Sequence, residues 1–256
     1  MKRRPNLLAL LLALVPAPAL AQAPAEPGVM LREGTWDGDI GGYEVPAAFS
    51  KLRATQWPGD GWYRIHLKEK AIEVAPMATP TQRLPAFLQG IVSQRERVEK
   101  NLPPPGARPP DPLEWVNAIF LRVPGVRLRE GAIAPYVFRN GTTMLSPILD
   151  HRYELALDGQ PFAFSVRNGL RGNDGRPYGD GAHYAIEYGG ERYEYALGEY
   201  GWDSRVSAIV DLDGDGKPDF VIAVGGNNSS YEAVLLSSTA RPGPNVPTAS
   251  LRAMGC

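Results

Sequence analysis

The stretch from Ile209 to Ile222 reads Ile-Val-Asp-Leu-Asp-Gly-Asp-Gly-Lys-Pro-Asp-Phe-Val-Ile and sets four aspartates between two apolar runs. Asp211, Asp213 and Asp215 occupy alternate positions, and Asp219 follows four residues later. A tight turn would aim these carboxylates at one point, where they repel one another unless a cation lies among them. Oxygen ligands without histidine or cysteine favour Ca²⁺ or Mg²⁺, and a cage made mostly of protein atoms favours Ca²⁺. The stretch therefore predicts a calcium loop over residues 211–219.

The remaining residues of this loop fit the same prediction. Gly214 and Gly216 can adopt the positive φ angles that so tight a loop requires. Lys217 can turn its backbone carbonyl inward as a further oxygen ligand, and the Asp219 carboxylate closes the cage. The alternative is a solvated acidic hairpin turn, because Asp-Gly pairs are common there. Such a turn needs only one Asp-Gly pair, whereas this loop has four spaced carboxylates.

The segments beside the loop predict strands rather than helices. An EF-hand opens with the same Asp-x-Asp-x-Asp-Gly but needs a Glu at position twelve and helices on both sides. Position twelve is Ile222, and Val206 to Val210 and Phe220 to Val224 are short and rich in β-branched residues. A strand, an Asp-x-Asp-x-Asp-Gly-x-x-Asp loop and a second strand resemble the FG-GAP or VCBS type of calcium repeat. That repeat is found in integrin α-chain propellers and in many secreted bacterial proteins.

The resemblance covers Ser207 to about Val224. It implies side-chain ligands at four aspartates and a carbonyl ligand at Lys217, which are the residues already singled out in the loop: Asp211, Asp213, Asp215 and Asp219. A propeller needs several blades, and this chain carries one good copy of the repeat. The resemblance therefore predicts a calcium loop between two strands, and a propeller architecture does not follow from it.

The N-terminus has the pattern of a secretory signal peptide. Lys2, Arg3 and Arg4 precede a nine-residue apolar run, and Ala19-Leu20-Ala21 supplies a small-residue cleavage site. Nine apolar residues are too few to cross a bilayer, which takes about 20. We expect cleavage after Ala21, a soluble mature protein and a periplasmic or secreted location. Extracellular calcium modules work with dissociation constants of about 10⁻⁴ to 10⁻³ M, so a single loop could be filled there.

Composition argues against nucleic acid as a partner and against internal disulfides. The chain has 27 basic and 28 acidic residues, and loss of residues 1–21 removes three basic residues and no acidic one, which leaves a net charge of −4. No cluster of Lys and Arg interleaved with aromatic residues is present. The single cysteine, Cys256, is the last residue, so stability must come from the core and the metal.

Along the chain we expect a mainly β fold of antiparallel hairpins in sandwich-like sheets, with one α-helix. Residues 22–101 form an N-terminal β segment plus the helix, which the spacing of apolar residues places at about 84–101. Within this segment, Trp62 to Leu67 and Ala71 to Ala75 form a strand pair. Residues 102–112 are a Pro-rich connector, 113–237 a β domain that holds the loop, and 238–256 an extended C-terminal tail.

Two hairpins of the β domain can be registered from alternation alone. A turn at Asp158-Gly159 places Leu155 opposite Phe162, and a turn at Gly189-Gly190 places Tyr184 opposite Tyr195. Each pairing puts one row of apolar and aromatic residues on a single face, and a slip of one residue would bury charges instead. We expect the tyrosines of the second hairpin to belong to the core and the sheet surface rather than to a binding platform.

The sequence favours a protein without catalytic activity that binds one structural Ca²⁺ and an unknown protein or glycan partner. It has no Gly-x-Ser-x-Gly, no His-Glu-x-x-His, no phosphate loop and no cysteine with a plausible catalytic partner. Two alternatives stay open. One is a calcium-stabilised secreted hydrolase that acts on polysaccharide or peptide through the cluster from Tyr200 to Asp203. The other is a glycan-binding module that uses the tyrosine-rich hairpin as its platform.

Overall fold

The computed structural model describes residues 28–32, 42–43, 46–49, 51–52, 57–68, 70–77, 118–168, 181–197, 203–225 and 229–254. Several sequence predictions fall outside these residues: the signal peptide 1–21, the helix 84–101, the connector 102–112 and the role of Cys256. They stay predictions. None of the helices in the described part of the chain is both long and apolar enough for a membrane span.

The described residues form three five-stranded sheets, which confirms the mainly β fold. The first sheet has the order β1-β5-β3-β4-β6: β1 is Val29–Leu31, β5 Ala118–Arg122, β3 Trp62–Leu67, β4 Ile72–Pro76 and β6 Gly131–Ile133. The central sheet has the order β11-β12-β13-β15-β2: β11 is Asp203–Val210, β12 Asp219–Gly225, β13 Ser229–Leu235, β15 Ala249–Met254 and β2 Gly42–Tyr43.

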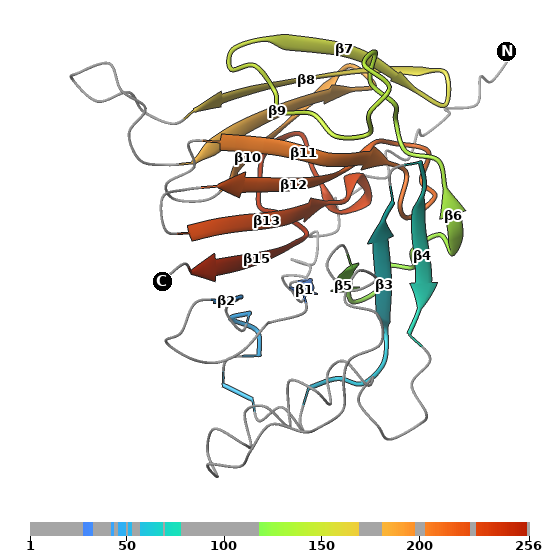
Figure 1. Cartoon of the computed structure of the whole chain (residues 1–256), viewed down its shortest axis with the longest axis vertical. Coiled ribbons are helices and arrows are strands. Elements are labelled where there is room, and N and C mark those ends of the chain that lie inside the picture. The colour runs from blue at the N-terminus through green and yellow to red at the C-terminus, as the bar shows by residue number, and fades with distance from the viewer. Residues whose placement is uncertain are drawn as a thin grey trace, which may run out of the picture.

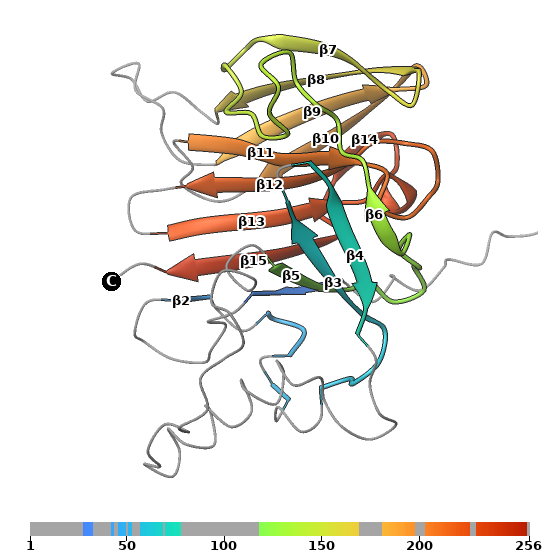
Figure 2. The same cartoon turned by 45° about the vertical axis from the view of Figure 1, so that its right-hand side comes forward.

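The third sheet, the outer sheet, lies on the other side of the central sheet (Figures 1 and 2). Its order is β14-β10-β9-β8-β7: β14 is Gly243–Asn245, β10 Glu191–Leu197, β9 Ala182–Tyr188, β8 Gln160–Asn168 and β7 Arg152–Leu157. Its β10–β14 pair is parallel, whereas the other strand pairs of the described chain are antiparallel. A short 3₁₀ turn, η2 (Ser237–Thr239), links β13 to β14.

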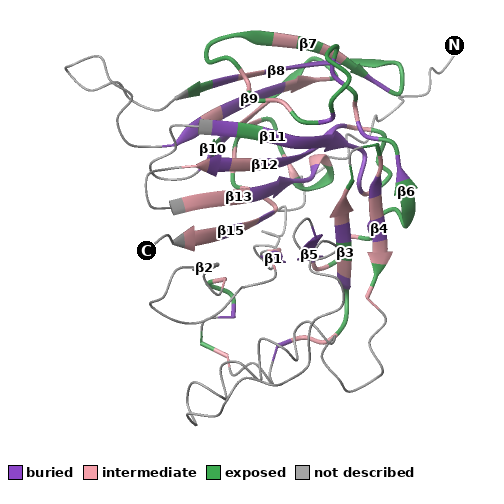
Figure 3. Ribbon diagram, viewed as in Figure 1, coloured by how far each residue is buried: buried purple, intermediate pink, exposed green. Residues whose placement is uncertain are grey.

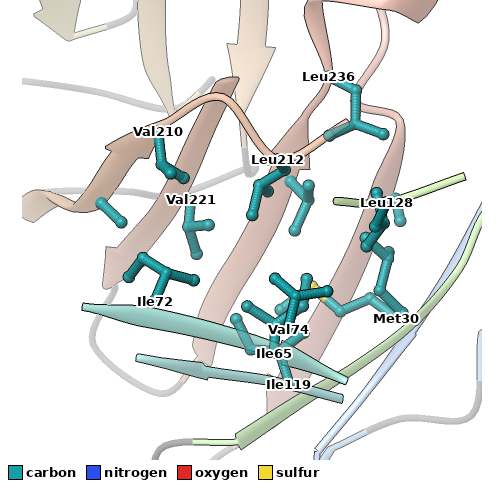
Figure 4. Close-up of a cluster of buried hydrophobic side chains, with 14 of the residues drawn as sticks. Met30, Ile65, Ile72, Val74, Ile119, Leu128, Val210, Leu212, Val221 and Leu236 are labelled. Atoms are coloured by element: carbon teal, nitrogen blue, oxygen red, sulfur yellow. The ribbon is translucent and has the colours of Figure 1, made fainter. Parts of the chain in front are cut away.

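The central sheet is buried on both faces, so its strands carry apolar residues on both sides. One face joins the first sheet in a core that includes Val210, Val221 and Val234 together with Ile65, Ile72 and Ile119 (Figure 4). The opposite face joins the outer sheet, where the Phe220 ring lies 5.6 Å from that of Phe164. By contrast, β7 at the edge of the outer sheet alternates between exposed and half-buried residues over most of its length (Figure 3).

A β-bulge lets β11 serve both cores. The register of the β11–β12 pair shifts between Val206 and Ala208, which leaves Ser207 as an extra residue. Side chains two residues apart in a regular strand share a face. Because of the bulge, Val206 instead packs in the core beside the outer sheet and Ala208 in the core beside the first sheet. The extra residue thus changes which face each later residue of β11 presents.

The free edge of β11 is covered by the chain segment that leads from the first sheet to the outer sheet. Leu145 and Val206 exchange backbone hydrogen bonds of 2.9 and 2.8 Å, and the Tyr136 amide donates to the Ile209 carbonyl at 2.8 Å. The Arg129 amide donates to the Leu212 carbonyl at 2.7 Å. Exposed strand edges invite pairing with other chains, and these bonds occupy this edge.

The three predicted hairpins are confirmed. Leu155 pairs with Phe162 and Tyr184 pairs with Tyr195, as alternation required. The early pair is β3 and β4, with Ile65 opposite Val74. Asp158 has φ 50° and Gly159 φ 78°, the positive angles that a type I′ turn demands at both central residues.

The extended C-terminal tail predicted for residues 238–256 is wrong. Within that stretch, Gly243–Asn245 form β14, which pairs with β10, and Ala249–Met254 form β15, which pairs with β13 over six residues. In β15 the buried Ala249 and Leu251 alternate with half-buried Ser250 and Arg252, so one row of side chains fills the core. The free edge of β13 also gains a partner for its backbone groups, which burial would otherwise penalise.

The N-terminal segment and the β domain, which the sequence analysis separated at residues 102–112, do not form separate sheets. The first sheet combines β1, β3 and β4, from before the connector, with β5 and β6, from after it. The expected N-terminal segment and β domain therefore share one sheet and one core.

This placement of the C-terminal region can be tested with a matched pair of substitutions. We expect Leu251→Ala, at a 2 % exposed side chain, to lower the free energy of unfolding by about 2–5 kcal/mol, because it leaves a cavity in the core. Val246→Ala, at an 84 % exposed side chain in the same region, should change it by less than about 0.5 kcal/mol. Urea unfolding measures both free energies. Equal, small effects of the two substitutions would contradict the burial of β15 in the core.

Candidate metal centre

The acidic loop lies between β11 and β12 and is held to the cores by apolar residues at both ends. Leu212 is fully buried and points into the core between the central and first sheets (Figure 4). Phe220, at the start of β12, is equally buried on the opposite side. Gly214 and Gly216 have φ angles of 79° and 78°, which confirms the positive angles predicted for them. The loop is therefore fixed between two packed layers.

The structure brings together Asp211, Asp213 and Asp215, as the sequence predicts. One carboxylate oxygen from each lies within 4.8 Å of the others. Asp211 is buried, Asp213 half-buried and Asp215 exposed, so the group opens to solvent on one side. The donors are all oxygen, with no histidine or cysteine in the group, and this set fits a hard cation such as Ca²⁺. The group could hold a metal ion.

Backbone amides of the loop hold the three carboxylates in place. The amides of Gly214 and Gly216 donate to the two oxygens of Asp211 at 2.8 and 3.2 Å. The Asp215 amide donates to Asp213 at 3.2 Å, and the Lys217 amide donates to Asp215 at 2.9 Å. Each bond orients a carboxylate and offsets part of the mutual repulsion. The loop is thus ordered around its aspartates by its own main chain.

Asp219 is fully buried beside this group and is held by different donors. Its Oδ2 accepts from the Leu212 amide at 2.7 Å, and its Oδ1 accepts from the Ser237 amide at 2.8 Å. Burial raises the pKa of Asp219 well above its ordinary value, and the charge of Asp213 raises it further. The two amide hydrogen bonds act in the opposite direction. Asp219 therefore connects the start of the loop to η2.

The group is electrostatically unfavourable when only the protein surrounds it. Burial is the largest cause that raises the pKa of Asp213, and the charges of Asp215 and Asp211 add to it. A hydrogen bond from the Ser238 hydroxyl lowers it in part. A bound cation would favour the ionised carboxylates and remove this cost.

Two serines of η2 complete the surroundings of the aspartates, and the sequence analysis missed them. Ser237 Oγ lies 3.0 Å from each oxygen of Asp215 and 2.9 Å from Asp219 Oδ1. Ser238 Oγ contacts Asp213 Oδ2. No local sequence pattern marks them: the pairing of Phe220 with Leu235 in β12 and β13, continued past the strand ends, is what places residues 237 and 238 beside the end of the loop.

The tyrosine-rich hairpin β9–β10 packs against the same loop. The Tyr188 hydroxyl donates to the Gly216 carbonyl at 3.1 Å. Tyr195 is 5 % exposed, and burial first and the charge of Asp219 second raise its pKa. Tyr184 is almost fully buried, and its hydroxyl shares a hydrogen bond of 2.6 Å with that of Ser204. Tyr184 and Tyr195 belong to the core, and Tyr188 and Tyr193 are half-buried and pack against it, as expected for core and sheet-surface residues.

The predicted ligands thus fall into two sets. Asp211, Asp213 and Asp215 form one group, whereas Asp219 lies next to that group and is engaged by backbone amides. The backbone amide of Lys217 donates to the Asp215 carboxylate. The roles of the Lys217 carbonyl and of Asp219 as metal ligands stay predictions.

Comparison with known proteins identifies this part of the chain. No curated protein and no solved structure matches the chain. The family model of the FG-GAP repeat matches residues 204–236, in a single copy. The match spans β11, the acidic loop, β12 and β13, which are the elements that form and flank the site. The β11–loop–β12–β13 unit of the central sheet therefore matches a single FG-GAP repeat.

Proposed function

We propose that this protein is an exported, non-catalytic binding or structural module in which one structural Ca²⁺ occupies the loop 211–219. The observation that carries the proposal is the group of three aspartates within 4.8 Å, in a segment that matches the FG-GAP repeat. Calcium would be held by Asp211, Asp213 and Asp215, with Asp219 and the Lys217 carbonyl completing the cage. The proposed signal peptide 1–21 would deliver the protein to a compartment rich in calcium.

A structural role fits the position of the loop. The loop joins β11 and β12, whose side chains pack in both cores. It is also hydrogen-bonded to η2 and to the outer sheet. A bound cation at this junction would hold three layers together by relieving the repulsion among the clustered carboxylates. Nothing in this arrangement requires a reacting group beside the metal.

Neither alternative function gains support at its proposed site. The hydrolase cluster lies mostly in residues 200–202, which are outside the described chain, so it stays a hypothesis. The glycan platform required exposed tyrosines, but Tyr184 and Tyr195 are buried and Tyr188 points to the metal loop. A partner would have to use another surface.

For the partner we propose the outer face of the outer sheet, turned away from the cores. A pocket of about 390 Å³ there has a floor of small residues that includes Ser165 and Ala185, and it is lined by Arg152, His183, Arg192 and Glu194. The volume falls within the range of ligand sites. Both signs of charge are present, and Arg192 pairs with Glu194 at 2.8 Å. A polar partner such as a glycan, rich in hydrogen-bonding groups, suits this lining better than an apolar one.

Calcium binding can be tested by isothermal titration of EDTA-stripped protein. We expect a one-site isotherm with a dissociation constant of about 10⁻⁴ to 10⁻³ M or lower. An Asp213→Asn, Asp215→Asn double variant should lose it, because the amides keep the shape of the side chains but remove two charges. Asp158→Asn, in a hairpin turn outside the loop, is the matched control and should bind as the unchanged protein does. A flat titration of the unchanged protein would reduce the loop to an acidic turn.

The raised pKa values of Asp219 and Asp213 predict how stability depends on pH. The unfolded chain loses these protons at about pH 4, whereas the folded, metal-free chain holds them to higher pH. The metal-free protein therefore loses stability as pH rises through this window, since its folded state binds more protons than its unfolded state. Calcium should cancel the loss because it stabilises the ionised carboxylates.

Melting curves with calcium and with EDTA, recorded from pH 4 to pH 7, measure this effect. We expect the two melting temperatures to separate as pH rises. At neutral pH and a calcium concentration one hundred times Kd, the gain of about 2.7 kcal/mol corresponds to about 5–10 °C for a chain of this length. Curves that coincide at every pH would contradict a structural metal at this loop.

The partner surface can be tested on arrays of cell-envelope and plant polysaccharides. We expect binding to some of the glycans and its loss in Ala185→Arg, because the long side chain fills the floor of the pocket. Val137→Arg, at a 54 % exposed residue that does not line this pocket, is the control and should still bind. Absence of binding to every glycan would reject a glycan as the partner.

A further inference from the structure

The turn η2 lies directly against the acidic loop and reaches three of its four aspartates. Ser237 Oγ is 3.0 Å from both oxygens of Asp215 and 2.9 Å from Asp219 Oδ1, and Ser238 Oγ contacts Asp213 Oδ2. The Ser237 amide adds a further bond to Asp219. Two consecutive residues from another part of the chain thus contact the aspartates with their side chains.

The contacts of Ser237 are more than one hydroxyl can satisfy. A serine hydroxyl has a single proton to donate and two lone pairs. Three carboxylate oxygens lie within 3.0 Å of Ser237 Oγ, so its proton cannot serve Asp215 and Asp219 fully at the same time. Wherever the proton points, the Ser237 oxygen also lies close to a carboxylate oxygen to which it donates no hydrogen bond, and two acceptor oxygens repel each other. A cation with oxygen ligands would make such a crowded set of acceptors favourable.

The same turn begins the C-terminal region that builds two sheets. From η2 the chain continues into β14, which extends the outer sheet beside β10, and into β15, which pairs with β13 in the central sheet. Thr239 keeps the turn closed, because its hydroxyl donates to the Leu236 carbonyl at 3.0 Å, and its hydroxyl makes no hydrogen bond to an aspartate of the described chain. The serines therefore face the loop, whereas the threonine holds the turn itself. The FG-GAP match ends at residue 236, one residue before Ser237.

We propose that Ser237 and Ser238 are positioning residues of the metal centre: their hydroxyls hold Asp213, Asp215 and Asp219 for the cation and couple its binding to the docking of β14 and β15. The proposal rests on the calcium site of the proposed function and extends it to residues beyond the repeat. Outer partners that orient metal ligands commonly contribute a factor of about 10–100 to metal affinity. Metal binding would then also order the C-terminal strands.

The experiment compares calcium affinities by isothermal titration of the full-length protein and three variants. Ser237→Ala with Ser238→Ala removes both hydroxyls and should weaken binding by about tenfold or more. Ser237→Thr with Ser238→Thr restores them and should recover most of the affinity. Thr239→Val removes a hydroxyl of the same turn, and this hydroxyl makes no hydrogen bond to any aspartate that the structure describes. The variant should therefore keep the calcium affinity within about a factor of two, even if it lowers the melting temperature.

Hydrogen exchange provides a second measurement that affinity alone does not replace. Calcium should slow amide exchange in β14 and β15 of the unchanged protein, and this protection should be smaller in the double alanine variant. If the double alanine variant binds calcium as tightly as the unchanged protein, the inference is overturned while the calcium site stands. If the unchanged protein binds no calcium, both the inference and the proposed function are overturned.

Discussion

The structure depends on the double burial of the β11–β12 hairpin. Val210 and Val221 pack toward the first sheet, whereas Ile209 and Phe220 pack toward the outer sheet, so one hairpin serves two cores. Apolar burial contributes roughly 25 cal/mol per Å², and a strand buried on both faces gains it twice. The bulge at Ser207 sets which residues face each core. The three layers meet at this hairpin, and the loop that closes it lies at their junction.

Charge and packing oppose each other at this junction. Leu212 and Phe220 are buried in the two cores. Their sequence neighbours Asp211 and Asp219 are therefore buried as well, with 6 % and 0 % of their surface exposed. Buried carboxylates are costly unless hydrogen bonds or a cation compensate them. Loop amides and two serine hydroxyls donate hydrogen bonds to these carboxylates, which is the compensation that the protein itself can offer. The raised pKa values of Asp213 and Asp219 indicate that this compensation is partial, and a cation would complete it.

The FG-GAP match is local, and the surrounding architecture explains how one copy can fold. In a propeller, neighbouring blades cover each repeat. Here the strands of the matched segment, β11, β12 and β13, are covered instead by the first sheet on one face and the outer sheet on the other. The edge of β11 is closed by the segment from Arg129 to Leu145, and that of β13 by β15. The repeat thus acts as the centre of a layered β fold.

The sequence alone determined the features that depend on near neighbours: the acidic loop, in which three of the four aspartates expected to converge do so, the strands beside it, and the registers of the Asp158-Gly159 and Gly189-Gly190 hairpins. These follow from turn chemistry and from alternation with a period of two. Tertiary structure decided what covers them. Ala249 to Met254 alternates like a strand, but six residues in a segment rich in Pro, Ser and Ala are too few to predict a strand from sequence. The strand forms because the edge of β13 is available for pairing. Ser237 and Ser238 look like ordinary turn residues, and only the pairing of β13 with β12 places their hydroxyls on the aspartates. Such contacts join residues about 20 positions apart, and their energy arises only when the sheets assemble, so no local pattern records them.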